Sequence, residues 1–262
     1  MTEAGRHAIV ADQLLVARQA GRLIESLNAQ LADTADGYAA QDALIDSAPW
    51  SVVGWKVGAT TPAAMKMFGT DEPFCGPIFE GNLFDSTNTE NPINLDGFIR
   101  PMVEGEFALV LGADLPVRLE EYSSEEIRAA VSAVRPAIEI VDFRLETFAT
   151  AGLPAIVADC SGNGGLVVGR STNDWVRADL ESAPVAMTVA GTLTGSGVGS
   201  DAFGHPVESL RWLANHLSKR GRGLLAGDTV TTGSCTGIAP VAPGQTATAD
   251  FGDLGQVIVD RT

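Results

Sequence analysis

From Val52 onward the chain consists of short apolar runs separated by clusters of glycine, proline, asparagine and aspartate. This texture predicts a body built of many short strands, because glycine and proline supply the turns between them. The 29 glycines and 13 prolines are enough for such a design. The expected strands cover residues 51–57, 104–111, 136–143, 165–169, 185–190, 229–232, 246–251 and 255–260.

The N-terminal part of the chain has a different pattern. Residues 9–31 place apolar side chains at the spacing of an amphipathic helix, and a second helix is expected over about 36–46. The proline within residues 47–50 ends that helix. We therefore predict a helical arm over residues 1–48 and a strand-rich catalytic domain over residues 49–262.

Two further helices are expected inside the strand-rich part. A capping box runs from Ser123 to Glu126, ahead of apolar residues that continue to Val134. Pro206 stands at a position that the first turn of a helix tolerates, and the helix after it stops at Gly221. Helices and short strands together predict an α+β chain.

The charge and the cysteine content argue against several classes of binding partner and indicate the cellular compartment. The net charge of −16 argues against nucleic acid and anionic membranes, which require clustered basic residues. Three widely spaced cysteines form neither a disulfide framework nor a zinc pattern, so we expect buried free thiols. No signal peptide is apparent, and no apolar run reaches about 18 residues. We expect a cytoplasmic protein.

Three glutamates stand inside apolar runs: Glu104 and Glu106 in RPMVEGEFALVLG, and Glu139 in RPAIEIVDF. A strand would direct Glu104 and Glu106 to one face, because side chains alternate with period two. Buried carboxylates are costly unless they are paired, protonated or bound to a metal. Convergence of all three would give an oxygen-only site for Mg²⁺ or a similar cation. The alternative is that they face solvent from half-exposed strands.

Several polar residues at strand ends are candidates for a site. Lys56, in Gly-Trp-Lys-Val-Gly, is either an exposed edge residue or a desolvated lysine whose pKa burial would lower. Asp159 and Ser161 lie in a glycine-rich turn that offers hydroxyl, amide and backbone N–H groups, or else form an ordinary Asx turn. Thr232 and Ser234 either line a site or only pack at the end of a strand.

These motifs together resemble the fumarylacetoacetate hydrolase superfamily. The likeness is closest to the branch of 2-keto-4-pentenoate hydratases and 4-oxalocrotonate decarboxylases, and it spans about residues 54–259. An E-x-E pair followed by a third glutamate roughly 30 residues later is quite specific when it occurs together with the other matching segments. The matching segments, in family order, are GWKVGAT, VEGEFALVLGADLP, RPAIEIVD, VADCSGNGG, FGHPVESLRWLANHL, LLAGDTVTTGS and APGQTATADFGDLGQV.

The resemblance implies a mixed β-sheet roll with flanking helices and an N-terminal helical region. It further implies that Glu104, Glu106 and Glu139 hold Mg²⁺ or Mn²⁺, and that Lys56 and Asp159 lie at the substrate as catalytic residues. The chain departs from the hydratase pattern at three positions. It has Phe74 where the hydratases have an aspartate, Met102 where a basic residue is usual, and Cys160 in place of an asparagine.

The function implied is hydration of a 2-hydroxy-alka-2,4-dienoate in aromatic catabolism, with a small 2-oxo acid bound through the metal. Phe74 is then expected to contact the substrate and to select an apolar tail. Alternatives are decarboxylation of a 2-oxo diacid, hydrolytic C–C cleavage of an acylpyruvate, and a non-catalytic subunit that keeps the fold. Missing histidines between His7 and His205 count against C–C cleavage. A homo-oligomer, at least a dimer, is expected.

Overall fold

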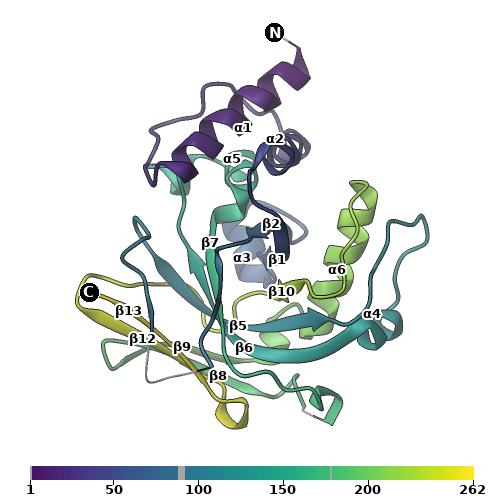
Figure 1. The fold of residues 1–262 in the computed structure, drawn as a ribbon, viewed down its shortest axis with the longest axis vertical. Coiled ribbons are helices and arrows are strands. Elements are labelled where there is room, and N and C mark those ends of the chain that lie inside the picture. The colour runs from purple at the N-terminus through teal and green to yellow at the C-terminus, as the bar shows by residue number, and fades with distance from the viewer. Residues whose placement is uncertain (1, 88–91, 178) are drawn as a thin grey trace.

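Two mixed β-sheets form the body of the molecule, and helices lie at its N-terminal end and along one side (Figure 1). The computed structural model describes residues 2–87, 92–177 and 179–262. The larger sheet has the order β2-β1-β10-β5-β6-β7-β3, with β11 also paired to β5. Its strands are β1 (Val52–Gly58), β2 (Phe74–Phe79), β3 (Leu83–Asp85), β5 (Met102–Leu111), β6 (Val131–Val141), β7 (Asn163–Val168), β10 (Thr229–Thr231) and β11 (Ala239–Pro240).

The smaller sheet has the order β4-β13-β12-β8-β9. Apolar residues of its strands share one large buried core with the larger sheet and with α6, as Met187, Phe107 and Leu213 illustrate. Figure 1 shows this sheet beside β5 and β6, on the opposite side from α6. Its strands are β4 (Ile93–Asn94), β8 (Pro184–Val189), β9 (Thr192–Val198), β12 (Gln245–Asp250) and β13 (Gln256–Arg261).

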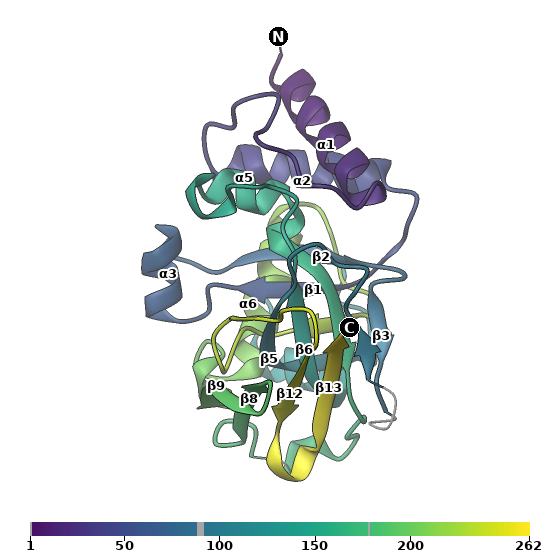
Figure 2. The same cartoon turned by 90° about the vertical axis from the view of Figure 1, so that its left-hand side faces the viewer.

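The helices cover the sheets and form the arm. Within the described residues, none of them combines the length and the apolar character that crossing a bilayer requires. Figure 2 shows α1 and α2 stacked with α5 at the N-terminal end of the molecule. The helices are α1 (Glu3–Gln19), α2 (Thr34–Ser47), α3 (Pro62–Phe68), α4 (Ser124–Ala130), α5 (Leu153–Ala158) and α6 (Pro206–Lys219).

The predicted α+β class is confirmed, and each of the eight expected strands is present within a few residues of its expected bounds. The helix predicted over residues 9–31 is wrong in extent. It begins at Glu3 and ends at Gln19, because Gly21 adopts a left-handed conformation (φ 55°) that closes helices. The apolar residues after it, such as Ile24 and Leu27, instead pack as an irregular segment against the cluster formed by α1 and α2.

The helix expected to continue to Val134 ends at Ala130, and the chain passes directly into strand β6. Strand β2, which contains Phe74, was not among the expected strands. The division into an arm and a catalytic domain at residue 48 stays a prediction. What the structure shows is that α1 and α2 pack against Cys160 and Phe79 of the strand-rich part.

The larger sheet curls, and this curl creates an inner face. Ile78 of β2 belongs to the same buried cluster as Leu166 and Val168 of β7, although four strands separate β2 from β7 in the sheet order. Two alanines, Ala108 and Ala137, fill the middle of this cluster. Because side chains in register on adjacent strands share a face, the inner face also carries the glutamates of β5 and β6.

Candidate metal centre and active site

The three glutamates converge on the inner face of the curled sheet. Glu104 of β5 stands directly opposite Glu139 of β6, and Glu106 follows two residues later on the same face. One carboxylate oxygen from each side chain lies within 4.8 Å of the other two. Glu106 and Glu139 are buried and Glu104 is half-buried. The solvent-facing alternative therefore does not describe these residues.

Burial and mutual repulsion disfavour the charged form of this cluster. Burial, followed by the charge of Glu139, raises the pKa of Glu104 to about 7. The same two causes, in the same order, raise the pKa of Glu106 well above its usual range. A nearby cation would therefore favour the charged forms of Glu104 and Glu106.

Lys56 is the protein's own cation at this site. Its Nζ lies 3.4 Å from Oε1 of Glu139, and its side chain is 5% exposed. Burial acts to lower the pKa of Lys56, but the charges of Glu139, Glu104 and Glu106 outweigh it, and the net effect is a raised pKa. The expectation that burial alone would set a lowered pKa is wrong, since it ignored the three carboxylates.

Hydrogen bonds from the surrounding chain hold two of the carboxylates but leave oxygens free. The backbone N–H of Gly233 donates to Oε2 of Glu106 at 2.8 Å. The side-chain amide of Asn163 donates to Oε1 of Glu139 at 3.0 Å, whereas Oε2 of Glu139 is buried and has no hydrogen-bond partner among the described residues. One ammonium cannot balance three carboxylates, and an oxygen-only donor set with a free buried oxygen fits a hard divalent cation.

The hydroxyl-bearing residues of the β10 segment are arranged differently from the prediction. The hydroxyl of Thr232 donates to the carbonyl of Phe107 at 2.9 Å, so it is already used. Thr231, which sequence reasoning missed, lies in register with Lys56 and Ala108 on the inner face. Its buried Oγ1 has no partner within the described residues. Alternation along β10 would have identified Thr231 had the strand's face been known.

Ser234 lies next to the cluster. Its hydroxyl acts to lower the pKa of Glu104, although burial and Glu139 raise that pKa overall. Its Oγ makes no hydrogen bond of normal geometry within the described part of the chain. Ser234 and Thr231 are thus two buried hydroxyls, near the carboxylates and Lys56, that remain available to a bound molecule.

Asp159 is buried in a network of its own. Arg18 of α1 donates to its Oδ1 at 2.8 Å, and the backbone N–H of Arg144 donates to its Oδ2 at 2.6 Å. Burial raises the pKa of Asp159, opposed by these two arginines. The hydroxyl of Ser161 donates to the carbonyl of Cys75 at 2.6 Å. Both side chains therefore already have partners within the protein, and their expected contacts with a substrate stay predictions.

Phe74 forms an apolar wall beside Lys56. Its ring packs edge-on against Phe68 of α3 with centroids 5.1 Å apart, and Nζ of Lys56 lies 5.4 Å from its centroid. Gly58 makes room for this ring, because a Cβ at that position would come within 2.6 Å of it. Cys75 is buried next to it, beneath Tyr38 of the arm.

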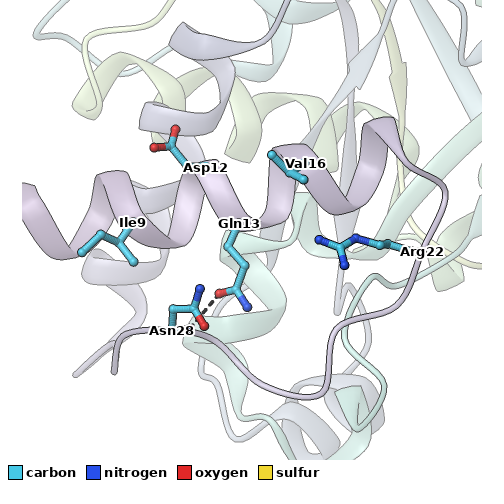
Figure 3. A pocket seen from close by; sticks show the side chains of 6 residues that line it. All are labelled: Ile9, Asp12, Gln13, Val16, Arg22 and Asn28. Atoms are coloured by element: carbon cyan, nitrogen blue, oxygen red, sulfur yellow. Dashed lines mark hydrogen bonds between the residues drawn. The ribbon is translucent and has the colours of Figure 1, made fainter.

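Two open hollows lie away from the carboxylates. One, of about 370 Å³, is on the outer face of α1 between Ile9, Val16 and Arg22 (Figure 3). The other, of about 490 Å³, separates the segment at residues 25–31 from Leu145 and α5. Neither is lined by a member of the glutamate cluster, and both involve the N-terminal arm.

The curled mixed sheet and its carboxylate cluster define a known class of protein. Residues 80–260, more than half of the chain, match the family described as "Fumarylacetoacetate (FAA) hydrolase C-terminal". The chain belongs to the fumarylacetoacetate hydrolase family, as its motifs predicted.

Particular members of the family are similar over nearly the whole chain. The chain is 31% identical over 268 residues to the 2-keto-4-pentenoate hydratase of Burkholderia vietnamiensis, with 98% of each protein covered. It is 30% identical over 249 residues to the 2-hydroxyhexa-2,4-dienoate hydratase of Comamonas testosteroni, covering 90% of this chain and 93% of that protein. Among solved structures, the 4-oxalocrotonate decarboxylase of Pseudomonas putida G7, complexed with magnesium and adipate, superposes with a TM-score of 0.87. That match has 26% identity and covers 100% of this chain and 99% of that one.

Proposed function

We propose that the protein is a divalent-metal-dependent hydratase that adds water to a 2-hydroxy-alka-2,4-dienoate. The observation that carries the proposal is the convergence of two buried carboxylates and one half-buried carboxylate with Lys56 inside a curled sheet. Relatives named as hydratases of such dienoates cover nearly the whole chain, which supports the same substrate class.

Glu104, Glu106 and Glu139 would hold Mg²⁺ or Mn²⁺. When bound, the cation would supply Lewis acidity toward the carboxylate and the 2-oxo group of the substrate. The protein fixes the ligands beforehand through the N–H of Gly233 and the amide of Asn163. Such donors orient carboxylate ligands and limit their motion.

The reaction requires a proton to leave the enol oxygen at C2 and another to be added at C5, which gives the 3-enone. Water then adds across C3 and C4, with the hydroxyl at C4. Lys56 is the buried group placed to move a proton in the first step. Burial acts against the charge of Lys56, but the neighbouring carboxylates outweigh it and raise its pKa, so the side chain is an ammonium that can donate a proton.

The environment of the site favours an apolar substrate tail. Phe74 and Phe68 present an aromatic surface beside Lys56. Within the described residues the hydroxyl of Thr231 has no hydrogen-bond partner, and it can bind the polar end of a 2-oxo acid, with the hydroxyl of Ser234 beside Glu104 as a second contact. A dienoate with a charged head and an apolar tail matches both surfaces.

Decarboxylation of a 2-oxo diacid is the second candidate, favoured by the close structural match to a 4-oxalocrotonate decarboxylase. Hydrolytic C–C cleavage is less well supported, because each of the three histidines contacts residues outside the glutamate cluster. His7 contacts Asp36, His205 caps α6, and His216 stacks on Trp212.

We also propose that the protein acts in the cytoplasm as a homo-oligomer, at least a dimer. Ile9 and Val16 on the outer face of α1 are 39% and 48% exposed, which is apolar surface that a second copy can cover. Light scattering at micromolar concentration would return at least twice the chain mass of 27.2 kDa.

The test of the reaction is incubation with Mg²⁺ and three substrates: 2-hydroxypenta-2,4-dienoate, a 2-oxo diacid and an acylpyruvate. Products are identified by mass. Hydration predicts a product of the first substrate that is heavier by one water. Turnover of the diacid with loss of CO₂, and none of the dienoate, would replace the hydratase with the decarboxylase.

A further inference from the structure

We propose that Arg18 of the N-terminal arm is a positioning residue for the metal centre, acting on Glu139 through Asp159 and Asn163. This inference rests on the proposed metal-dependent function and extends it to the arm. Arg18 lies on α1, more than 120 residues before Glu139, and its side chain is 8% exposed. Buried arginines are rare, and the side chain of this one contacts a distant segment and not its own helix, so helix stability alone does not explain it.

The first link joins Arg18 to both ends of the segment from Asp159 to Asn163. Its Nη2 donates to Oδ1 of Asp159 at 2.8 Å and to the main-chain carbonyl of Asp159 at 2.7 Å. Its Nη1 donates to the carbonyl of Asn163 at 2.9 Å. The planar guanidinium therefore fixes the distance between the two ends of this segment.

The segment between these ends is strained and needs such support. Cys160 and Ser161 have φ values of 51° and 55°, and Gly162 follows at 75°. Non-glycine residues in the left-handed region are strained and persist where surrounding contacts hold them. Arg18 holds the two ends, and the bond from Ser161 to the carbonyl of Cys75 holds the middle.

The last link reaches the metal ligand. Asn163 donates its side-chain amide to Oε1 of Glu139 at 3.0 Å, the same oxygen that faces Lys56. In the part of the chain that the structure describes, Oε2 of Glu139 has no hydrogen-bond partner. The orientation of Glu139 thus depends on where Asn163 sits, and Arg18 bonds the main chain of Asn163. In this arrangement Asp159 anchors Arg18 and does not itself touch the glutamates.

The experiment measures Mn²⁺ affinity of the metal-free full-length protein by electron paramagnetic resonance, with no substrate present. Asn163→Ala removes the donor to Glu139, and we expect affinity to fall about 10- to 100-fold, the range typical of groups that orient ligands. Arg18→Met would leave Asp159 buried and unpaired, so it is combined with Asp159→Asn. This double variant should lose affinity to a similar extent.

A matched control and a coupling test separate positioning from general destabilisation. Arg6→Met alters another arginine of α1, whose nearest acidic group is Glu3 at 3.9 Å, and should leave affinity unchanged. Adding the double change to Asn163→Ala should cause little further loss, because both act through one contact. Arg18→Lys keeps the charge beside Asp159 and should retain part of the affinity.

Affinity within twofold of the wild type in the folded double variant would overturn the proposal. Should the double variant not fold, Arg18→Lys decides: a measurable loss supports positioning, and unchanged affinity overturns it. The outcome is separable from that of the proposed function. Wild-type protein that binds Mn²⁺ but hydrates no dienoate would remove the hydratase assignment and leave the role of Arg18 intact.

Discussion

Replacing Glu106 by glutamine should stabilise the metal-free protein while abolishing its response to metal. Glutamine keeps the size of the side chain and an oxygen that can accept from the N–H of Gly233. It removes a negative charge that is 1% exposed and lies within 4.8 Å of two other carboxylates. At an effective dielectric constant of about 20, each such pair repels by about 3 kcal/mol.

Part of this gain is lost, because Lys56 no longer has the charge of Glu106 nearby. Because the pKa of Glu106 is itself raised, the full pairwise repulsion is an upper bound. We therefore expect a net stabilisation of up to about 2–3 kcal/mol at pH 8, where Glu104, with a pKa of about 7, is ionised. For a chain of this size, 1 kcal/mol shifts the midpoint by about 2–4 °C, so the metal-free variant should melt above the wild type by up to about 12 °C.

The assay is thermal unfolding followed by circular dichroism, with chelator or with saturating Mg²⁺. Ligand binding at about 100 times its dissociation constant stabilises the folded state by about 2.7 kcal/mol, so the wild type should gain several degrees and the variant none. Glu80→Gln, at an exposed glutamate, is the control and should change neither value. A metal-free variant that melts below the wild type would show that the carboxylates do not repel one another as the structure indicates.

Four further changes test the site. Lys56→Met should lower turnover by about 10²- to 10⁴-fold in steady-state assays while Mn²⁺ still binds; unchanged turnover at saturating substrate would remove the lysine from the chemistry. Phe74→Asp should weaken binding of dienoates with apolar tails, seen as a raised KM, whereas Phe74→Leu should not; better hydration of short dienoates with no loss elsewhere would show that Phe74 selects nothing. Thr231→Val should raise KM with little change in melting temperature, because its hydroxyl has no hydrogen-bond partner to lose among the described residues. An unaltered KM would exclude the hydroxyl from binding. The apparent Mg²⁺ affinity measured by calorimetry should fall as the pH drops below about 7, because the proton on Glu104 then competes with the metal. The stability that this proton gives to the metal-free protein should be lost as the pH rises through the same value. A Mg²⁺ affinity that is independent of pH between 6 and 8 would contradict the raised pKa of Glu104.

Strand alternation is a local property, so it predicted that Glu104 and Glu106 share a face, whereas the inclusion of Glu139 in one cluster was implied by the family resemblance. Glu104 and Glu106 share a face whatever the fold, and Glu139 stands in a second apolar run that pairs with the first. The same alternation gives the wrong residues when it is not known which face of the strand points inward, because neighbouring residues lie on opposite faces. Thr232 was chosen as a site residue, but the free hydroxyl belongs to its neighbour Thr231.

Other parts of the site depend on contacts that local pattern does not record. Nothing around Arg18 indicates that it binds Asp159, 141 residues away, because that contact exists only once α1 packs on the strand-rich part. Strand β2 was not predicted; it contains Gly76 and Pro77, and glycine and proline are depleted in strands. Gly76 is nevertheless required there. A Cβ at Gly76 would come within 2.1 Å of the carbonyl oxygen of Cys160.

The most direct test of the metal-centred mechanism is a crystal structure of the full-length protein grown with Mn²⁺, with anomalous data collected at the manganese edge. We predict a single anomalous peak bound by oxygens of Glu104, Glu106 and Glu139, and with Mg²⁺ in its place distances of about 2.0–2.1 Å. Crystals of Glu106→Gln should lack the peak. Three glutamates pointing apart, or no peak among them at saturating Mn²⁺, would contradict the proposed site and the hydration chemistry that depends on it.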